Sequence, residues 1–105
     1  MDVQIARSAD DTGRPVLTLT GSIDLQTRDR LIEAGRAVLA EESVLVLDLA
    51  GVTFLDSTGI GALVELSGDA KEASGELVLR NPSSRVERVL ELTGLTDVWA
   101  TETGD

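Results

Sequence analysis

Near the start of the chain, apolar residues alternate with polar ones, as they do in strands that have one buried face. Val3 and Ile5 follow this pattern, residues 16–23 follow it again, and the turn-forming segment 10–15 (DDTGRP) between them predicts a hairpin. Residues 44–47 (VLVL) are apolar without interruption, which predicts a central strand that is buried on both faces.

The strand pattern continues beyond this central run. We expect the central strand to end at Asp48 and Leu49, and the chain to turn at residues 50–51 (AG) on its way to the next helix. Residues 77–79 predict a fourth strand, and residues 98–100 predict a short last strand.

Three segments repeat their apolar residues at helical spacing instead, near residues 28–41, 58–73 and 84–93. Polar residues precede each segment, and their side-chain oxygens can accept hydrogen bonds from the first backbone N–H groups of a helix. The predicted N-caps are Thr27 for the first helix, one of Asp56, Ser57 and Thr58 for the second, and Ser84, paired with Glu87 in a capping box, for the third. Gly94 is expected to end the third helix.

This alternation of strands and helices predicts an α/β fold: a mixed sheet of four or five strands with helices packed against it. With 105 residues, the chain is expected to form a single domain over residues 1–105. The ordered core is expected at about 2–100, and residues 101–105 form a polar tail with little reason to be ordered.

The net charge of the chain disfavours partners that are themselves negatively charged. Nineteen acidic residues against nine basic ones give a net charge of −10. Such a surface repels the phosphates of nucleic acids and anionic membranes, so neither is an expected partner. No apolar run reaches the length that spans a bilayer, and we expect a cytoplasmic protein.

Histidine and cysteine are both absent from the sequence. Disulfides, the usual zinc ligands and the commonest general base are therefore missing, and any chemistry would have to use carboxylates and hydroxyls. We expect no enzymatic activity, no metal and no cofactor.

The most informative motif is Asp56-Ser57-Thr58-Gly59, which stands where the second helix begins. A hydroxyl at a helix N-terminus faces free N–H groups and the positive end of the helix dipole, so the fold would tolerate a phosphate there. A phosphate would also add about −1.5 to −2 charge units beside Asp56. Helix capping alone explains the local motif, and a phosphate acceptor is the alternative that context must decide.

Three enzymatic interpretations of this region fail on missing residues. A P-loop ATPase would need a GxxxxGK[ST] segment, which is absent. A phospho-accepting receiver with Asp48 as its acceptor would need an acidic pair after the first strand and a lysine after the last, but Lys71 is the only lysine. In an aspartic-protease triplet, one hydroxyl residue separates Asp from Gly, whereas two do so here.

Four segments resemble the STAS domain family and, within it, the bacterial anti-sigma factor antagonists. They are residues 21–24 (GSID), 48–52 (DLAGV), 54–61 (FLDSTGIG) and 90–96 (LELTGLT), in the family's order and spacing. The similarity extends from about residue 3 to residue 99, and it implies a STAS-like single domain.

The resemblance also implies a function. In this family, the first hydroxyl residue after the motif's Asp is phosphorylated by an anti-sigma factor that is itself a serine kinase, so the acceptor here would be Ser57. The unphosphorylated antagonist binds the anti-sigma factor and frees the sigma factor, whereas the phosphorylated form is released until a PP2C-type phosphatase restores it. The implied partner-binding residues are Ser22, Asp24, Asp56, Ser57, Thr58, Gly59 and Gly61.

The family leaves a second function open. Some STAS domains with similar motifs are never phosphorylated and serve as scaffolds, as transporter tails or as accessory subunits of lipid-transport ATPases. Nucleotide binding has been proposed for some members. Because no transporter segment accompanies this chain, we favour the phosphorylated antagonist.

Overall fold

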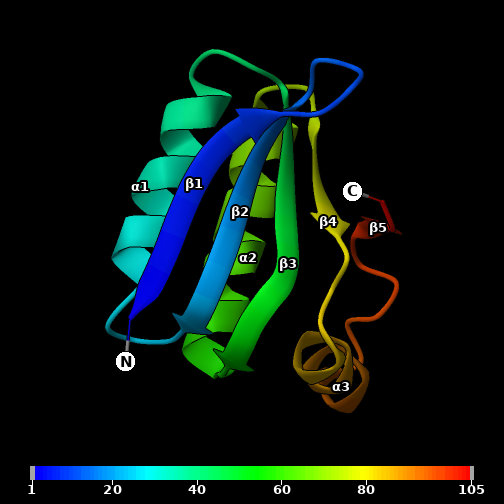
Figure 1. Ribbon diagram of the computed structural model, residues 1–105. Coiled ribbons are helices and arrows are strands. Elements are labelled where there is room, and N and C mark those ends of the chain that lie inside the picture. Colours follow the sequence, from blue (N-terminus) through cyan, green and yellow to red (C-terminus); the bar gives the residue numbers. More distant parts are fainter. Residues whose placement is uncertain (1, 105) are drawn as a thin grey trace.

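The computed structural model describes residues 2–104, which form one mixed sheet with three helices (Figure 1). The strands are β1 (Val3–Ala9), β2 (Pro15–Ile23), β3 (Val44–Leu55), β4 (Glu76–Arg80) and β5 (Ala100–Glu102). They lie in the order β1-β2-β3-β4-β5; β1 is antiparallel to β2, and every other pair is parallel. The predicted hairpin, the mixed sheet and the α/β class are confirmed.

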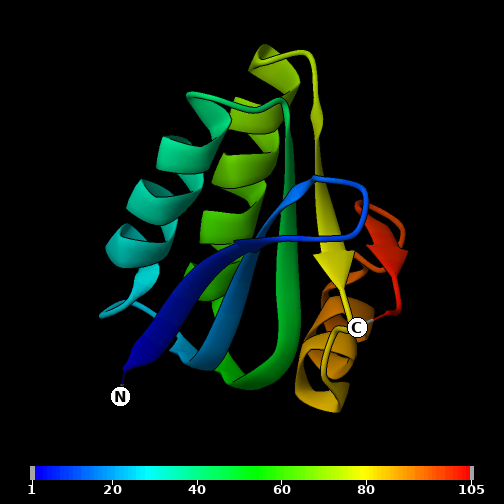
Figure 2. The same ribbon diagram turned by 45° about the horizontal axis from the view of Figure 1, so that its top comes forward.

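The helices are α1 (Arg28–Leu39), α2 (Ser57–Glu72) and α3 (Ser84–Thr93). Figures 1 and 2 show α1 and α2 side by side on one face of the sheet, with α3 beyond the end of β4. Each helix lies within two residues of its predicted bounds at both ends. The opposite face of the sheet has no helix over it in the described part of the chain.

Burial of β3 on both faces is confirmed. Leu45 and Leu47 point into the main aliphatic core, while Val46 packs with Val16 and Val78 in a small cluster on the other face. Leu45, Val46 and Leu47 are all fully buried. A continuous apolar run is therefore needed here, because alternate residues of β3 enter the main core on one face and the small valine cluster on the other.

The predicted turn after this run is wrong, because β3 continues without a break to Leu55. Its pairing with β2 shifts register twice, between Thr18 and Thr20 and between Gly21 and Ser22, so the strand absorbs its irregular residues as bulges. Asp48 takes part in this irregularity, since its carboxylate accepts a hydrogen bond from Ala50 N at 3.1 Å.

The tail boundary also needs correction. The last strand occupies Ala100–Glu102 rather than residues 98–100, so two residues that were assigned to the polar tail belong to the sheet. Glu102 forms ion pairs with Arg14 and Arg80, and Gly104 N donates to the side chain of Asn81 at 3.0 Å. These long-range contacts order the segment, and its polar composition gave no sign of them.

Two of the predicted caps differ as well. Ser83, not Ser84, caps α3, because its Oγ accepts from Val86 N at 3.3 Å. Thr27 stands at the N-cap of α1 but makes no capping bond. The end of α3 is as predicted, since Gly94 adopts the left-handed conformation with φ of 73°.

Candidate functional site

The predicted site lies at the edge of the sheet where β2 and β3 end and α2 begins. Ile23 and Leu55, the last residues of these parallel strands, are paired, and Asp56 N donates to Ile23 O at 3.4 Å. The chain segments that follow the two strands, one with Asp24 and one with Asp56 and Ser57, therefore leave the sheet side by side.

Asp56 settles which of the three candidates caps α2. Its Oδ1 accepts from Gly59 N at 2.9 Å, and its main-chain oxygen accepts from Ile60 N at 2.9 Å. Ser57 is thus the first residue of the helix and is exposed, while Thr58 is half-buried. Because Asp56 provides the cap, the hydroxyl of Ser57 is not needed to start the helix.

Gly59 fixes the position of this helix start against the sheet. A Cβ atom at this residue would lie 2.4 Å from Ile23 O and 2.6 Å from a methyl carbon of Leu55. Only glycine permits so close an approach without a shift of the backbone. The helix N-terminus is therefore held against the end of β2.

The loop that carries Asp24 is closed by reciprocal hydrogen bonds. Asp24 Oδ1 accepts from Gln26 N at 3.0 Å and from Thr27 N at 3.2 Å. In return, Thr27 Oγ1 accepts from Asp24 N at 3.0 Å and donates to Ser22 O at 2.8 Å. Asp24 is only 8% exposed and Thr27 only 2%, so both side chains shape the loop from inside.

The implied partner-binding residues thus divide by exposure. Ser57 and Gly61 are exposed, and Asp56 and Thr58 are half-buried. Ser22, Asp24 and Gly59 are buried, so they can shape a partner surface but offer it little area. The structure brings all seven residues to the same edge of the sheet or to the first turns of α2.

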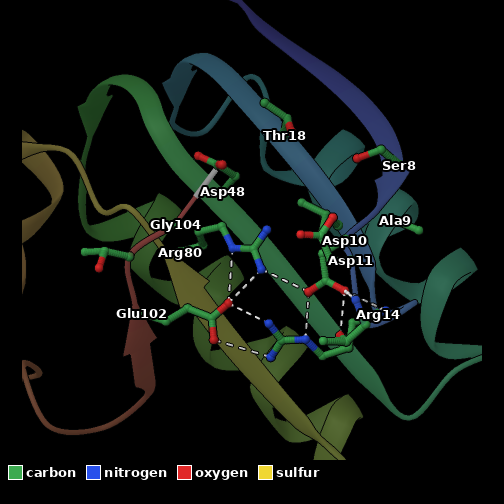
Figure 3. Close-up of a pocket in the computed structure, with 13 residues that line it drawn as sticks. Ser8, Ala9, Asp10, Asp11, Arg14, Thr18, Asp48, Arg80, Glu102 and Gly104 are labelled. Carbon is green, nitrogen blue, oxygen red and sulfur yellow. Dashed lines mark hydrogen bonds and ion pairs between the residues drawn. The ribbon is translucent and has the colours of Figure 1, made fainter.

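A second polar cluster, which no motif indicated, lies on the helix-free face of the sheet (Figure 3). Arg80, on β4, donates to Asp10 at 2.9 Å and to Glu102 at 2.8 Å. Arg14 donates to the same two carboxylates, at 2.8 Å and 2.7 Å. We call these four residues the arginine–carboxylate cluster.

The environment of this cluster keeps its carboxyl groups charged. Hydrogen bonds from Thr12, and to a smaller extent from Arg14, hold the pKa of Asp10 well below its ordinary value. Hydrogen bonds from Arg14, and to a smaller extent from Arg80, lower the pKa of Glu102. The cluster borders an open hollow of about 510 Å³. Since both arginines already bind carboxylates, we interpret the cluster as a link between the first hairpin and β5.

Within residues 2–104, no helix is both long and apolar enough to cross a membrane. In the same described segment, no three acidic side chains gather closely enough to hold a metal ion.

Comparisons with known proteins agree with the fold and the motifs. A family model described as the STAS domain matches residues 4–103. An anti-sigma-B factor antagonist of Listeria monocytogenes is 32% identical over 99 residues, which cover 93% of this chain and 87% of that protein.

Solved structures of anti-sigma factor antagonists also resemble this chain. The crystal structure of an anti-sigma factor antagonist from Mycobacterium paratuberculosis is 31% identical with a TM-score of 0.77, and the match covers 95% of this chain and 85% of that one. Unphosphorylated SpoIIAA, also an anti-sigma factor antagonist, shares the fold with a TM-score of 0.79 at 18% identity, over 97% of this chain and 90% of that one. With the family model and a relative above 30% identity both spanning nearly its whole length, this chain belongs to the STAS domain family.

Proposed function

We propose that this protein is an anti-sigma factor antagonist that is switched by phosphorylation of Ser57. In its unphosphorylated form it binds an anti-sigma factor with serine kinase activity, and the sigma factor is released. Phosphorylation by that kinase ends the binding, and a PP2C-type phosphatase restores it. The names of the similar proteins support binding to an anti-sigma factor, and the position of Ser57 supports the phosphorylation switch.

One observation carries the proposal of the switch. Ser57 is an exposed hydroxyl at the mouth of α2, while the neighbouring Asp56 already caps the helix. A phosphate at this position would face the positive end of the helix dipole, so the fold can accept it. It would add about −1.5 to −2 charges to a surface that a partner must contact.

The switch needs no catalytic residue on this chain and no refolding. A partner that tolerates Asp56 next to a neutral hydroxyl would meet two or three negative charges after phosphorylation, and like charges disfavour the contact. Ser57, Thr58, Gly61 and Asp56 would form the contact surface. Ser22, Asp24 and Gly59 would keep that surface in shape, and the protein would act in the cytoplasm.

Intact-mass measurement tests the proposal. The chain is mixed with ATP and each anti-sigma factor kinase encoded in the same genome, and the product is weighed. We expect one phosphate on the wild type and none on Ser57→Ala, with partner binding retained by the variant.

Ser84→Ala is the matched control. Ser84 is also an exposed first residue of a helix, directly after a capping side chain. This variant should be phosphorylated like the wild type. Stoichiometric phosphorylation of Ser57→Ala would move the acceptor to Thr58 or another hydroxyl. A wild type that binds none of the kinases would favour the other function of STAS domains, an unphosphorylated scaffold or accessory subunit, for which nucleotide binding would be the next assay.

A further inference from the structure

Four large apolar side chains are exposed on the described surface: Leu25, Val64, Leu92 and Val98. Leu92 and Val98 belong to the C-terminal part of the chain. Leu25 and Val64 instead come from the loop after β2 and from α2, the two segments that form the edge around Ser57.

The backbone contacts place Leu25 beside the start of α2. Asp56 N donates to Ile23 O at 3.4 Å, and Leu25 follows Ile23 by two residues, a chain reach of at most about 7 Å. Val64 lies on the same face of α2 as Ser57, seven residues and about two turns along.

The loop 24–27 holds Leu25 outward in a fixed position. The carboxylate of Asp24 and the hydroxyl of Thr27 are both used inside the loop, so its polar groups are satisfied without a partner. Leu25, between them, is 72% exposed. Exposed turn positions usually carry polar residues. A rigid loop with an exposed leucine is preorganised to insert that side chain into another surface at a low entropic cost.

Gly61 leaves room for a partner between Ser57 and Val64. A Cβ atom at this position would meet nothing within 4 Å, so packing inside the domain does not require glycine here. Glycine inside a helix costs about 1 kcal/mol relative to alanine. Its absence of a side chain lets atoms of a partner approach the backbone of α2 next to Ser57.

The charges at this edge indicate what kind of surface fits it. Arg28, the first residue of α1, is already paired with Asp29 and Glu65 at 3.0 Å and 3.5 Å. Asp29 is exposed and Asp56 is half-buried, on a chain with a net charge of −10. A complementary partner would therefore present an apolar pocket with lysine or arginine side chains around it.

We propose that Leu25 is the apolar anchor of the complex with the anti-sigma factor, and that it enters a non-polar pocket with a cationic rim on that partner. Asp24 and Thr27 are positioning residues that hold the loop in the shape this contact needs. The inference rests on the proposed function and specifies which part of the surface supplies the binding energy.

The test compares two leucines of almost equal exposure. Leu25→Ala and Leu92→Ala, the latter 74% exposed on α3, are titrated by calorimetry against the anti-sigma factor kinase that binds the wild type. Burying a leucine side chain at an interface predicts that Leu25→Ala raises Kd about 10-fold or more. Leu92→Ala should leave Kd within about 2-fold, as surface changes outside an interface do. Leu25→Met keeps an apolar side chain of similar size and should restore most of the affinity.

Each other outcome is decisive. If Leu25→Ala binds as tightly as the wild type, the anchor is elsewhere, although the proposed function stands. If sedimentation shows a wild-type dimer that Leu25→Ala dissociates while the Kd for the kinase is unchanged, the residue serves self-association and the inference is overturned. If the wild type binds none of the kinases, the proposed function fails and this inference fails with it.

Discussion

Replacing either of two glycines of α2 by alanine should change the stability of the domain in opposite directions. At Gly59, the added methyl group would lie 2.4 Å from Ile23 O, a backbone atom, and 2.6 Å from Leu55. At Gly68, which is exposed, it would meet nothing within 4 Å. The same substitution in the same helix therefore isolates the contact with the end of β2.

The expected magnitudes follow from two opposing effects. Alanine favours a helix interior over glycine by about 1 kcal/mol, and Gly68→Ala should gain most of this amount. Gly59→Ala gains less, because it lies in the first turn, and it forces α2 away from a backbone carbonyl. Overpacking of this kind costs about 1–3 kcal/mol, so we expect a net loss of roughly 2 kcal/mol.

Thermal unfolding followed by circular dichroism measures both changes. For a domain of this size, 1 kcal/mol corresponds to a shift in Tm of about 4 °C, so the two variants should differ by roughly 10 °C. An unchanged or raised stability of Gly59→Ala would refute the argument that α2 is held against β2 by this contact. A loss at Gly68→Ala would show that the helix propensity argument does not apply to this face.

Two further predictions concern the caps and the arginine–carboxylate cluster. Ser83→Ala should lower the free energy of unfolding by about 1 kcal/mol because Val86 N loses its acceptor, whereas Ser84→Ala should leave it nearly unchanged; equal losses in urea titrations would contradict the assignment of the cap. The pKa values of Asp10 and Glu102 are lowered in the folded state, so the pairing of these carboxylates stabilises the fold. This stabilisation is complete at a pH above the ordinary carboxyl pKa. It is lost as the pH falls from the ordinary pKa toward the lowered pKa of the folded state. Between pH 7 and pH 2, Tm should therefore fall more for the wild type than for Arg80→Met, and parallel curves would exclude the pairing with Arg80 as a source of acid sensitivity.

The sequence predicted the features that depend on neighbouring residues. Helical spacing placed α2 to within one residue at each end, and the choice of cap was limited to three residues, of which Asp56 proved correct. Gly94 was identified because a left-handed residue after a helix favours glycine. Ser84 was predicted as the cap of α3 because its spacing to Glu87 fits a capping box, and this local pattern indicated the wrong serine, since Ser83 provides the cap.

Features that depend on distant residues were missed. The hydrogen bond between Arg80 and Asp10 joins residues 70 positions apart, and composition alone made Asp10 a turn residue. Glu102 was assigned to a disordered tail because its partners, Arg14 in the first hairpin turn and Arg80 on β4, are invisible in its own segment. The burial of Asp24 has a different cause, since Thr27 is only three residues away and the closure of the loop depends on side-chain geometry.

The order of the strands in space is the same as their order along the chain. Each strand after β1 therefore pairs with a neighbour that was synthesised before it, and the sheet can grow in one direction as the chain leaves the ribosome. The first and last strands are also its two edges. Shortening the chain from either end would remove an edge strand and leave the central pair of β2 and β3 with the start of α2 intact.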